Sequence, residues 1–235
     1  MDIESVYKSK LINAEQVADL IESDTDIIVA QCASEPQGCM GKFHLAKDRV
    51  HDVKVFSVLT LKPYDFYMKP EMKGHFELCS WFHAPGSRQA LKEGTGTVTY
   101  VPNMLHRAAT DRLKVRRPHM FVGTCTPPDE KGYVSLSLGV TYEKDIFDVA
   151  ELKILEVNKH LPRTFGDTHV HISEVDYFVE HHQIPPTLPS PQPDEEAMKI
   201  GEHVAKLVED GATIQLGIGE IPNAVALSLK GKKDL

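Results

Sequence analysis

Short apolar runs typical of strands alternate along this chain with segments that carry apolar residues at helical spacing. The repeating unit of strand and helix is about 25 residues long, which is typical of crossover connections between parallel strands. We therefore expect an α/β fold in which an open, mostly parallel sheet is flanked by helices. The expected strands are 26–31, 53–60, 76–82, 97–101, 119–125, 133–138 and 153–157. The expected helices are 13–21, a helix that follows a turn over 33–38 and runs to about 48, 85–93, 104–113 and 145–152.

Two proline-containing segments interrupt this alternation. The segment 127–132 holds the Pro, Asp and Gly of a tight reversal, so we expect a hairpin-like excursion between the strands on either side. The segment 185–193 is proline-rich and can form neither a helix nor a central strand. It predicts an extended linker, which divides the chain into a domain over 1–184 and a further segment over 194–235.

The segment 194–235 predicts a helix, a strand and a second helix. Asp194 is expected to cap the first helix, and Gly211 is expected to end it. The apolar face of this helix is expected to consist of Ile200, Val204, Leu207 and Val208. The second helix is expected over 222–230, opening with Pro222. Because three elements bury too little apolar surface to stand alone, we interpret them as the incomplete start of a second domain similar to the first.

Overall composition excludes several classes of function. The chain has 235 residues, 41% of them hydrophobic, and a net charge of -8, which argues against nucleic acid as a partner. No apolar run approaches the ~18 residues of a membrane span, and the N-terminus lacks the pattern of a signal peptide. Four cysteines without a C-x-x-C pair indicate reduced thiols. We expect a cytoplasmic protein that does not bind membranes.

A strand-to-helix turn with two glycines, Gly217 and Gly219, is the first candidate binding site. Glycines let the backbone approach a ligand, and such turns are where α/β proteins place ligands. The turn lacks the third glycine of a dinucleotide site and the lysine of a P-loop. Glu220 would repel a phosphate, so a neutral acyl, thioester or pantetheine group is preferred. A tight connection without any ligand is the alternative.

Glu35 and Pro36 form the second candidate, because they follow the first expected strand at the ligand side of an open sheet. The carboxylate could act as a base, or it could be an N-terminal helix charge with Pro36 at the first helical position. A metal site is not expected, although His169 and His171 would share one face of a strand. No carboxylate or cysteine completes a ligand set at typical spacing.

Several segments in order resemble the acetyl-CoA hydrolase/transferase family, and within it the 4-hydroxybutyrate and butyrate–acetate CoA-transferases. The resemblance covers nearly all of the chain. The most specific match is 215–225, Q-L-G-I-G-x-I-P-N-A-V. The other matching segments are Ser34-Glu35-Pro36, 74–88, 127–133, 156–158, 162–167 and 175–177.

This resemblance implies an enzyme that moves CoA between short carboxylic acids through a glutamyl-CoA thioester. Acyl-CoA, a short carboxylic acid and the C-terminal half of the same enzyme would be its partners, in a homo-oligomer. CoA would be a substrate, and no covalently bound cofactor is implied. The family's CoA contacts carry over to Gly217, Ile218, Gly219, Glu220 and Ile221. Gln215, Asn223, Glu35 and Pro36 are secondary candidates.

In this family the nucleophilic glutamate is expected just beyond Leu235, so the resemblance assigns no catalytic residue to this chain and implies that it is inactive alone. Glu220 stands where the family usually has a small residue. Two alternatives stay open: an acyl-CoA hydrolase of the same family, and a non-catalytic module of the same α/β build that binds CoA or a sugar phosphate. A nicotinamide dehydrogenase is disfavoured, since the ribose-binding acid about 20 residues on is missing.

Overall fold

The computed structural model describes residues 2–187 and 192–235, and the chain forms two compact units, Met1–Pro186 (unit 1) and Thr187–Leu235 (unit 2). Of the expected linker 185–193, residues 188–191 lie outside the described residues. Among the described residues, no helix combines the length and apolar character needed to cross a membrane.

Unit 1 contains a seven-stranded sheet in the order β4-β3-β2-β1-β5-β7-β9, and the pairings between its neighbouring strands are parallel. This confirms the expected open parallel α/β sheet. The chain starts at the centre with β1, builds outward through β2, β3 and β4, and then returns to add β5, β7 and β9. The strands are β1 (Asp26–Val29), β2 (Val53–Ser57), β3 (Phe76–Ser80), β4 (Val98–Tyr100), β5 (Met120–Cys125), β7 (Leu152–Val157) and β9 (Tyr177–Glu180).

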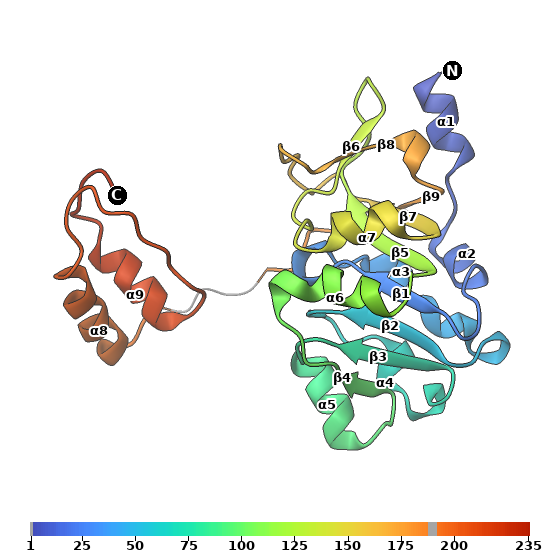
Figure 1. The fold of residues 1–235 in the computed structure, drawn as a ribbon, viewed down its shortest axis with the longest axis horizontal. Helices are drawn as coiled ribbons and strands as arrows, with labels where there is room; N and C mark the ends of the chain where they lie inside the picture. Colours follow the sequence, from blue (N-terminus) through green and yellow to red (C-terminus); the bar gives the residue numbers. More distant parts are fainter. Residues whose placement is uncertain (1, 188–191) are drawn as a thin grey trace. The chain divides into compact units, whose positions relative to one another are not determined.

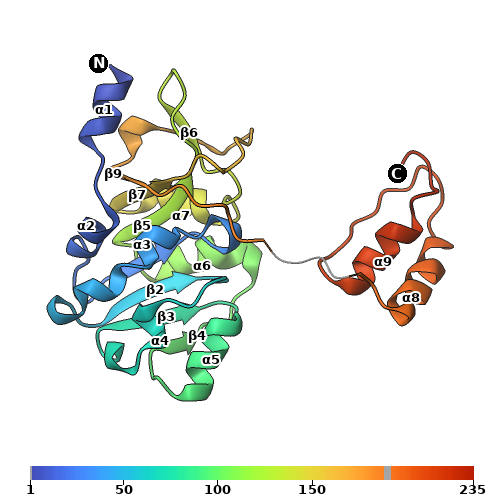
Figure 2. The ribbon, with the colours of Figure 1, turned by 180° about the vertical axis from the view of Figure 1, so that it is seen from behind.

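Both faces of the sheet are buried, because alternate residues of its central strands point into two separate apolar cores. Ile27 and Val29 of β1 belong to one core, and Ile28 belongs to the other. The first core packs under α2 (Ala14–Asp19), α3 (Gln37–Met40), η2 (Phe43–Arg49), α4 (Asp65–Met68) and α5 (Pro85–Glu93). The second packs under α1 (Ile3–Ser9), α6 (Ala108–Val115) and α7 (Glu143–Val149). Figure 1 shows α6 and α7 in front of the sheet, and Figure 2 shows α2 and α3 from the opposite side.

Helix boundaries in unit 1 follow local capping chemistry. Asn13 caps α2 in a capping box with Gln16, and Gly94 ends α5 in the left-handed conformation with φ 69°. The helix expected between the turn 33–38 and about residue 48 is wrong in detail, since α3 already begins at Gln37 and stops at Met40, and a separate 3₁₀ segment, η2, follows. The expected helix 104–113 likewise begins as a 3₁₀ turn, η4 (Leu105–Arg107), before α6, and α7 lies slightly earlier than the expected 145–152.

The excursion after β5 reverses as expected. The amide of Asp129 donates to the carbonyl of Tyr133 at 2.9 Å, which closes the turn. The amide of Thr126, the residue after β5, also donates to the carbonyl of Ser135 at 2.9 Å, so the excursion is hairpin-like as expected. The strand β6 (Tyr133–Ser135) has its ladder with β8 (His169–His171), to which it pairs antiparallel. The two form a separate small sheet that covers the second core near η5 (Ile172–Glu174).

Unit 2 is a pair of packed helices, α8 (Glu195–Ala205) and α9 (Glu220–Ser228). The Asp194 side chain accepts from the amide of Ala197, which confirms the expected cap. The apolar face expected on α8 is wrong for three of its four residues: Ile200, Val204 and Leu207 are 41%, 36% and 84% exposed. The fourth, Val208, lies beyond the end of α8 and packs against the small core of this unit. The buried face of α8 instead consists of the small residues Ala197, Gly201 and Ala205.

The strand expected at 213–218 is not formed, because within the described residues no neighbouring strand pairs with it and a strand needs a partner. This segment is extended chain, and Ile214 and Leu216 are partly exposed. Helix α8 ends before Gly211, which therefore does not cap it, and α9 begins at Glu220, two residues earlier than expected. Pro222 still lies in its first turn, where a missing N–H is tolerated.

The close approach of α8 and α9 predicts a cost for the smallest enlargement of Gly201. A Cβ there would lie 2.7 Å from the backbone C and O of Ala224, so Gly201→Ala must push the helices apart. We expect amide hydrogen exchange in α8 and α9 to show a loss of about 1–3 kcal/mol in local stability. Glu202→Ala, at an exposed position of the same helix, is the control. Protection equal to or greater than that of the control would contradict the prediction, because alanine is by itself the better helix former.

Candidate functional site

The loops that leave the carboxyl ends of β1, β2 and β3 meet the segment after β4 around a cavity of about 360 Å³. This is the edge at which open parallel sheets bind ligands. The side chains and backbone around the cavity are uncharged and mostly apolar. They belong to Gln31, Cys32, Val58, Leu59, Trp81, Phe82, Asn103, Met104, Leu105 and Ala108. We call this the edge cavity.

Cys32 lies in the edge cavity at the first position after β1 that leaves the sheet conformation. Its φ is 55°, a left-handed backbone that side chains rarely adopt, and it opens the 3₁₀ turn η1 (Cys32–Ser34). Burial raises the pKa of the Cys32 thiol, and the carboxyl groups of Glu143 and Glu35 add to that rise. The thiol is therefore held uncharged. The sequence analysis did not nominate Cys32, because nothing in the local sequence indicates its backbone conformation.

Glu35 is buried immediately beyond this turn, with 2% of its surface exposed. Its Oε2 accepts from the amide of Leu61 at 2.9 Å, and its Oε1 accepts from the hydroxyl of Tyr64 at 2.9 Å. Glu35 thus fastens the loop after β1 to the loop after β2. Burial raises the pKa of Glu35 to about 7, because desolvation outweighs these hydrogen bonds. Pro36 is the residue before α3 and not its first residue, which corrects the expected position.

Two further buried carboxylates hold the same loop, and the sequence analysis missed both. Glu143, at the start of α7, accepts from the amide of Gln31 at 3.3 Å. Glu156, near the end of β7, accepts from the amide of Cys39 at 2.9 Å. Burial raises the pKa of each. The chain from Gln31 to Cys39 is therefore held near its start, its middle and its end by carboxyl groups. Their shared feature is burial, which a sequence does not display.

Unit 2 contains the glycine turn nominated from the sequence. Gly219 has a φ of 144° and precedes α9 as its N-cap residue, a backbone that favours glycine. Ile218 is fully exposed, and Gly217 and Gln215 are also exposed. The Glu220 side chain accepts from the amide of Asp194 at 2.8 Å, so it ties the start of α9 to the start of α8. The amide of Asn223 donates to the carbonyl of Gly219 at 3.1 Å, within the first turn of α9, whereas Ile221 is half-exposed.

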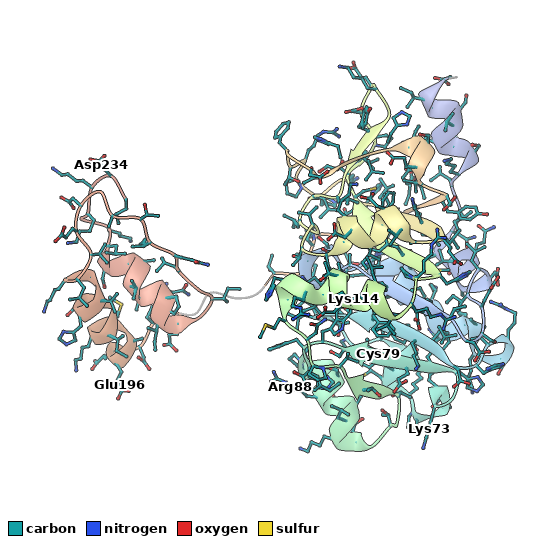
Figure 3. The ribbon with its side chains drawn as sticks, in the orientation of Figure 1. Lys73, Cys79, Arg88, Lys114, Glu196 and Asp234 are labelled. Carbon is teal, nitrogen blue, oxygen red and sulfur yellow. The ribbon has the colours of Figure 1, made fainter. Side chains whose placement is uncertain are left out.

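The nominated residues therefore fall into two groups. Glu35 and Pro36 belong to the carboxyl edge of the sheet in unit 1, and the nominated residues of 215–223 surround the start of α9 in unit 2. The residues of each group lie together within their own unit. Arg88, labelled in Figure 3, lies on α5, where its Nε donates to the carbonyl of His83.

Within the described part of the chain, one group of side chains could hold a metal ion: Asp24, His51 and Asp52. All three are exposed, and they precede β1 and β2 at the amino edge of the sheet, opposite the edge cavity. His169 and His171 belong to no such group among these residues. His171 instead caps η5, with its ring 2.8 Å from the Ser173 hydroxyl.

Comparison with known proteins places this architecture in a family. Residues 1–189 match the acetyl-CoA hydrolase/transferase N-terminal domain. A 4-hydroxybutyrate coenzyme A transferase from Clostridium kluyveri is 34% identical over 100% of this chain and 54% of its own length. A succinyl-CoA:cyclohexane-1-carboxylate CoA transferase from Geobacter metallireducens is 32% identical over 99% of this chain and 52% of its own length. The chain thus spans about half the length of these relatives.

Solved structures agree with this assignment. RipA from Yersinia pestis superimposes with a TM-score of 0.92 at 31% identity, covering 100% of this chain and 57% of RipA. A 4-hydroxybutyrate CoA-transferase from Porphyromonas gingivalis has a TM-score of 0.76 at 23% identity over 98% of this chain and 54% of its own, and it supports the fold alone. The chain belongs to the acetyl-CoA hydrolase/transferase N-terminal domain family.

Proposed function

We propose that this chain is the acyl-binding part of a CoA-transferase that moves CoA between short-chain carboxylic acids. The observation that carries the proposal is the uncharged cavity at the carboxyl edge of the sheet, in a chain whose relatives are named as CoA transferases. CoA is then a substrate, carried in as an acyl thioester. The acids that exchange are of the 4-hydroxybutyrate, butyrate and acetate type.

The chemistry requires a carboxylate nucleophile, and we assign it to the part of the relatives that this chain does not span. That carboxylate attacks the thioester carbonyl and expels CoA as a thiolate, leaving a mixed anhydride. The thiolate then attacks the glutamyl carbonyl, releases the first acid and forms a glutamyl-CoA thioester. The second acid reverses the two steps and leaves as its own CoA thioester, so the free carboxylate is regenerated.

The buried carboxylates of this chain are unsuited to that attack. Glu35 has 2% of its surface exposed, and both of its oxygens already accept hydrogen bonds, from Leu61 and Tyr64. A nucleophile must reach the thioester carbon at about 3–3.5 Å, which a covered carboxylate cannot do. We therefore assign Glu35 a positioning role, in which it fixes the loops that shape the edge cavity.

The glycine turn of unit 2 is proposed to contact CoA. The resemblance assigns the family's CoA contacts to Gly217, Ile218, Gly219, Glu220 and Ile221. The exposure of Ile218 and the backbone conformation of Gly219 support an open approach to this turn. The Glu220 side chain already bonds the amide of Asp194, so the turn would contribute backbone N–H groups rather than a side-chain charge. Residues 194–235 are then the start of a second similar domain.

CoA exchange tests the proposal directly. A chain extended by the remaining half that its relatives possess is incubated with butyryl-CoA and acetate, and acetyl-CoA is measured. We expect acetyl-CoA to form at the expense of butyryl-CoA, and the 235-residue chain alone to give none. Thioester loss at the same rate without acetate would indicate a hydrolase. The absence of exchange with any short acid would contradict the proposal.

The positioning role of Glu35 predicts a distinct pH dependence of stability. The folded pKa of about 7 lies above the ordinary 4.5, so the folded state holds the proton more tightly than the unfolded chain. This contribution is fully present below pH 4.5 and is lost as the pH rises through 7, and it amounts to about 3 kcal/mol. Between pH 4.5 and pH 8 the parent should therefore lose about 3 kcal/mol of unfolding free energy through Glu35. Glu35→Gln has no carboxyl group to ionise there, so it should not show this loss.

Urea unfolding at a series of pH values measures this difference. Glu71→Gln replaces an exposed glutamate and serves as the control, with a curve parallel to that of the parent. A Glu35→Gln curve that is also parallel to the parent would show that Glu35 ionises as freely in the fold as outside it.

A further inference from the structure

We propose, on the basis of the function proposed above, that the edge cavity receives the acyl group and selects an uncharged aliphatic acyl chain longer than acetyl. Dicarboxylic half-thioesters such as succinyl are excluded. The charge, the exposed rim and the rigidity of the cavity support this selectivity, and all of its lining belongs to unit 1.

The charge of the lining argues against a second carboxylate on the acyl chain. None of the ten residues around the edge cavity is acidic or basic, and the two long polar side chains, Gln31 and Asn103, are neutral amides. Arg88 lies 6.0 Å from the centre of the Phe82 ring at the rim, but it is exposed, and its Nε donates to the carbonyl of His83. A carboxylate inside the cavity would therefore meet no cation among the lining residues, and unpaired buried charge is strongly disfavoured. A neutral alkyl chain meets no such penalty.

An adjoining cavity of about 490 Å³ shares Trp81 and Asn103 with the edge cavity and does carry cations. These cations do not line the edge cavity and are not available to an acid bound in it. Arg112 forms a buried ion pair with Asp26, and Arg116 also approaches that carboxylate, at 3.9 Å. Lys54 lies four residues before Val58, which lines the edge cavity. In extended chain this spacing separates the two Cα atoms by roughly 13 Å.

The rim of the edge cavity argues for an apolar occupant. Phe82, Met104 and Leu105 are 55%, 65% and 50% exposed, and all three line the same cavity. Large apolar side chains gathered at one exposed hollow mark a binding site. Each methylene that the acyl chain buries there should tighten binding about four-fold. Butyryl, with two methylenes more than acetyl, should therefore bind about 15-fold more tightly.

The inner wall is held in place before any ligand arrives. Trp81 is buried with 4% of its surface exposed, and its ring packs at 5.8 Å from that of Phe56 and at 5.4 Å from that of Tyr142. The backbone of Gln31, another lining residue, is fixed by the hydrogen bond from its amide to Glu143. A preformed cavity discriminates by the shape and charge of its occupant rather than by refolding around it.

Trp81 provides the readout, because it is the one tryptophan in the sequence and it lines the cavity. The probes are N-acetylcysteamine thioesters of acetate, butyrate, hexanoate and succinate, which share one neutral leaving arm and differ only in the acyl group. Titration of the 235-residue chain is followed by tryptophan fluorescence. We expect butyryl and hexanoyl thioesters to shift the emission, with butyryl about 15-fold tighter than acetyl, and succinyl to give no shift.

A charge placed in the rim should invert this preference. Leu105→Arg introduces a cation at the cavity and should weaken butyryl and admit succinyl, with their affinity ratio changing at least about ten-fold. Leu91→Arg is the matched control, since Leu91 is 45% exposed on α5 and lines neither of the two cavities. Its preference should equal that of the parent.

Three results would overturn the inference: succinyl binding as tightly as butyryl, no response of Trp81 to any thioester, or equal behaviour of the two arginine variants. A response of Trp81 to the added C-terminal half but to no thioester would identify the cavity as a docking surface between the halves. The outcomes are separable from the proposed function. If the extended chain exchanges CoA but no thioester binds in the edge cavity, the proposed transferase function stands and the proposed acyl site is wrong. If the cavity selects apolar thioesters but the extended chain exchanges no CoA, the acyl site stands and the transferase function is wrong.

Discussion

The structure depends on the anchoring of one loop at the carboxyl edge of a parallel sheet. The segment from Gln31 to Cys39 leaves the central strand, and the buried carboxyl groups of Glu143, Glu35 and Glu156 fix it to α7, to the loop after β2 and to β7. Burial of these groups is costly, and their raised pKa values reflect that cost. Gln31 and Cys32, at the start of the anchored segment, line the edge cavity, so this part of its lining is held by the fold without any ligand.

This arrangement separates two tasks that a CoA-transferase must perform. In the proposed function, the apolar, uncharged cavity of unit 1 is assigned to the acyl chain, and the exposed glycine turn of unit 2 is assigned to CoA. The lining of the edge cavity includes no carboxylate, and the exposed Glu220 of the turn is bonded to the amide of Asp194. In the proposed enzyme the nucleophile therefore comes from elsewhere, and the residues described here bind and orient the substrate.

The parallel sheet could be predicted from the sequence, because the apolar pattern of each strand and helix can be read without knowing which elements pack together. The position of Glu35 after the first strand, at the carboxyl edge of the sheet, was also predicted correctly. The sequence could not identify Glu143 and Glu156, since each reads as an ordinary charged residue of a helix or strand, and only tertiary burial distinguishes them. The segment 213–218 has the apolar composition of a strand, but no strand pairs with it among the described residues, so it remains extended chain. The buried face of α8 was misjudged because Gly201 permits close packing that hydrophobicity alone does not indicate.

Amide hydrogen exchange at Leu61 tests the central claim most directly. If the Glu35 carboxyl anchors the loop after β2, this amide is protected in the parent chain, and Glu35→Ala releases it while amides of the central strand β5 stay protected. The account is contradicted if the Leu61 amide exchanges in the parent as fast as an exposed loop, or if Glu35→Ala leaves its protection unchanged.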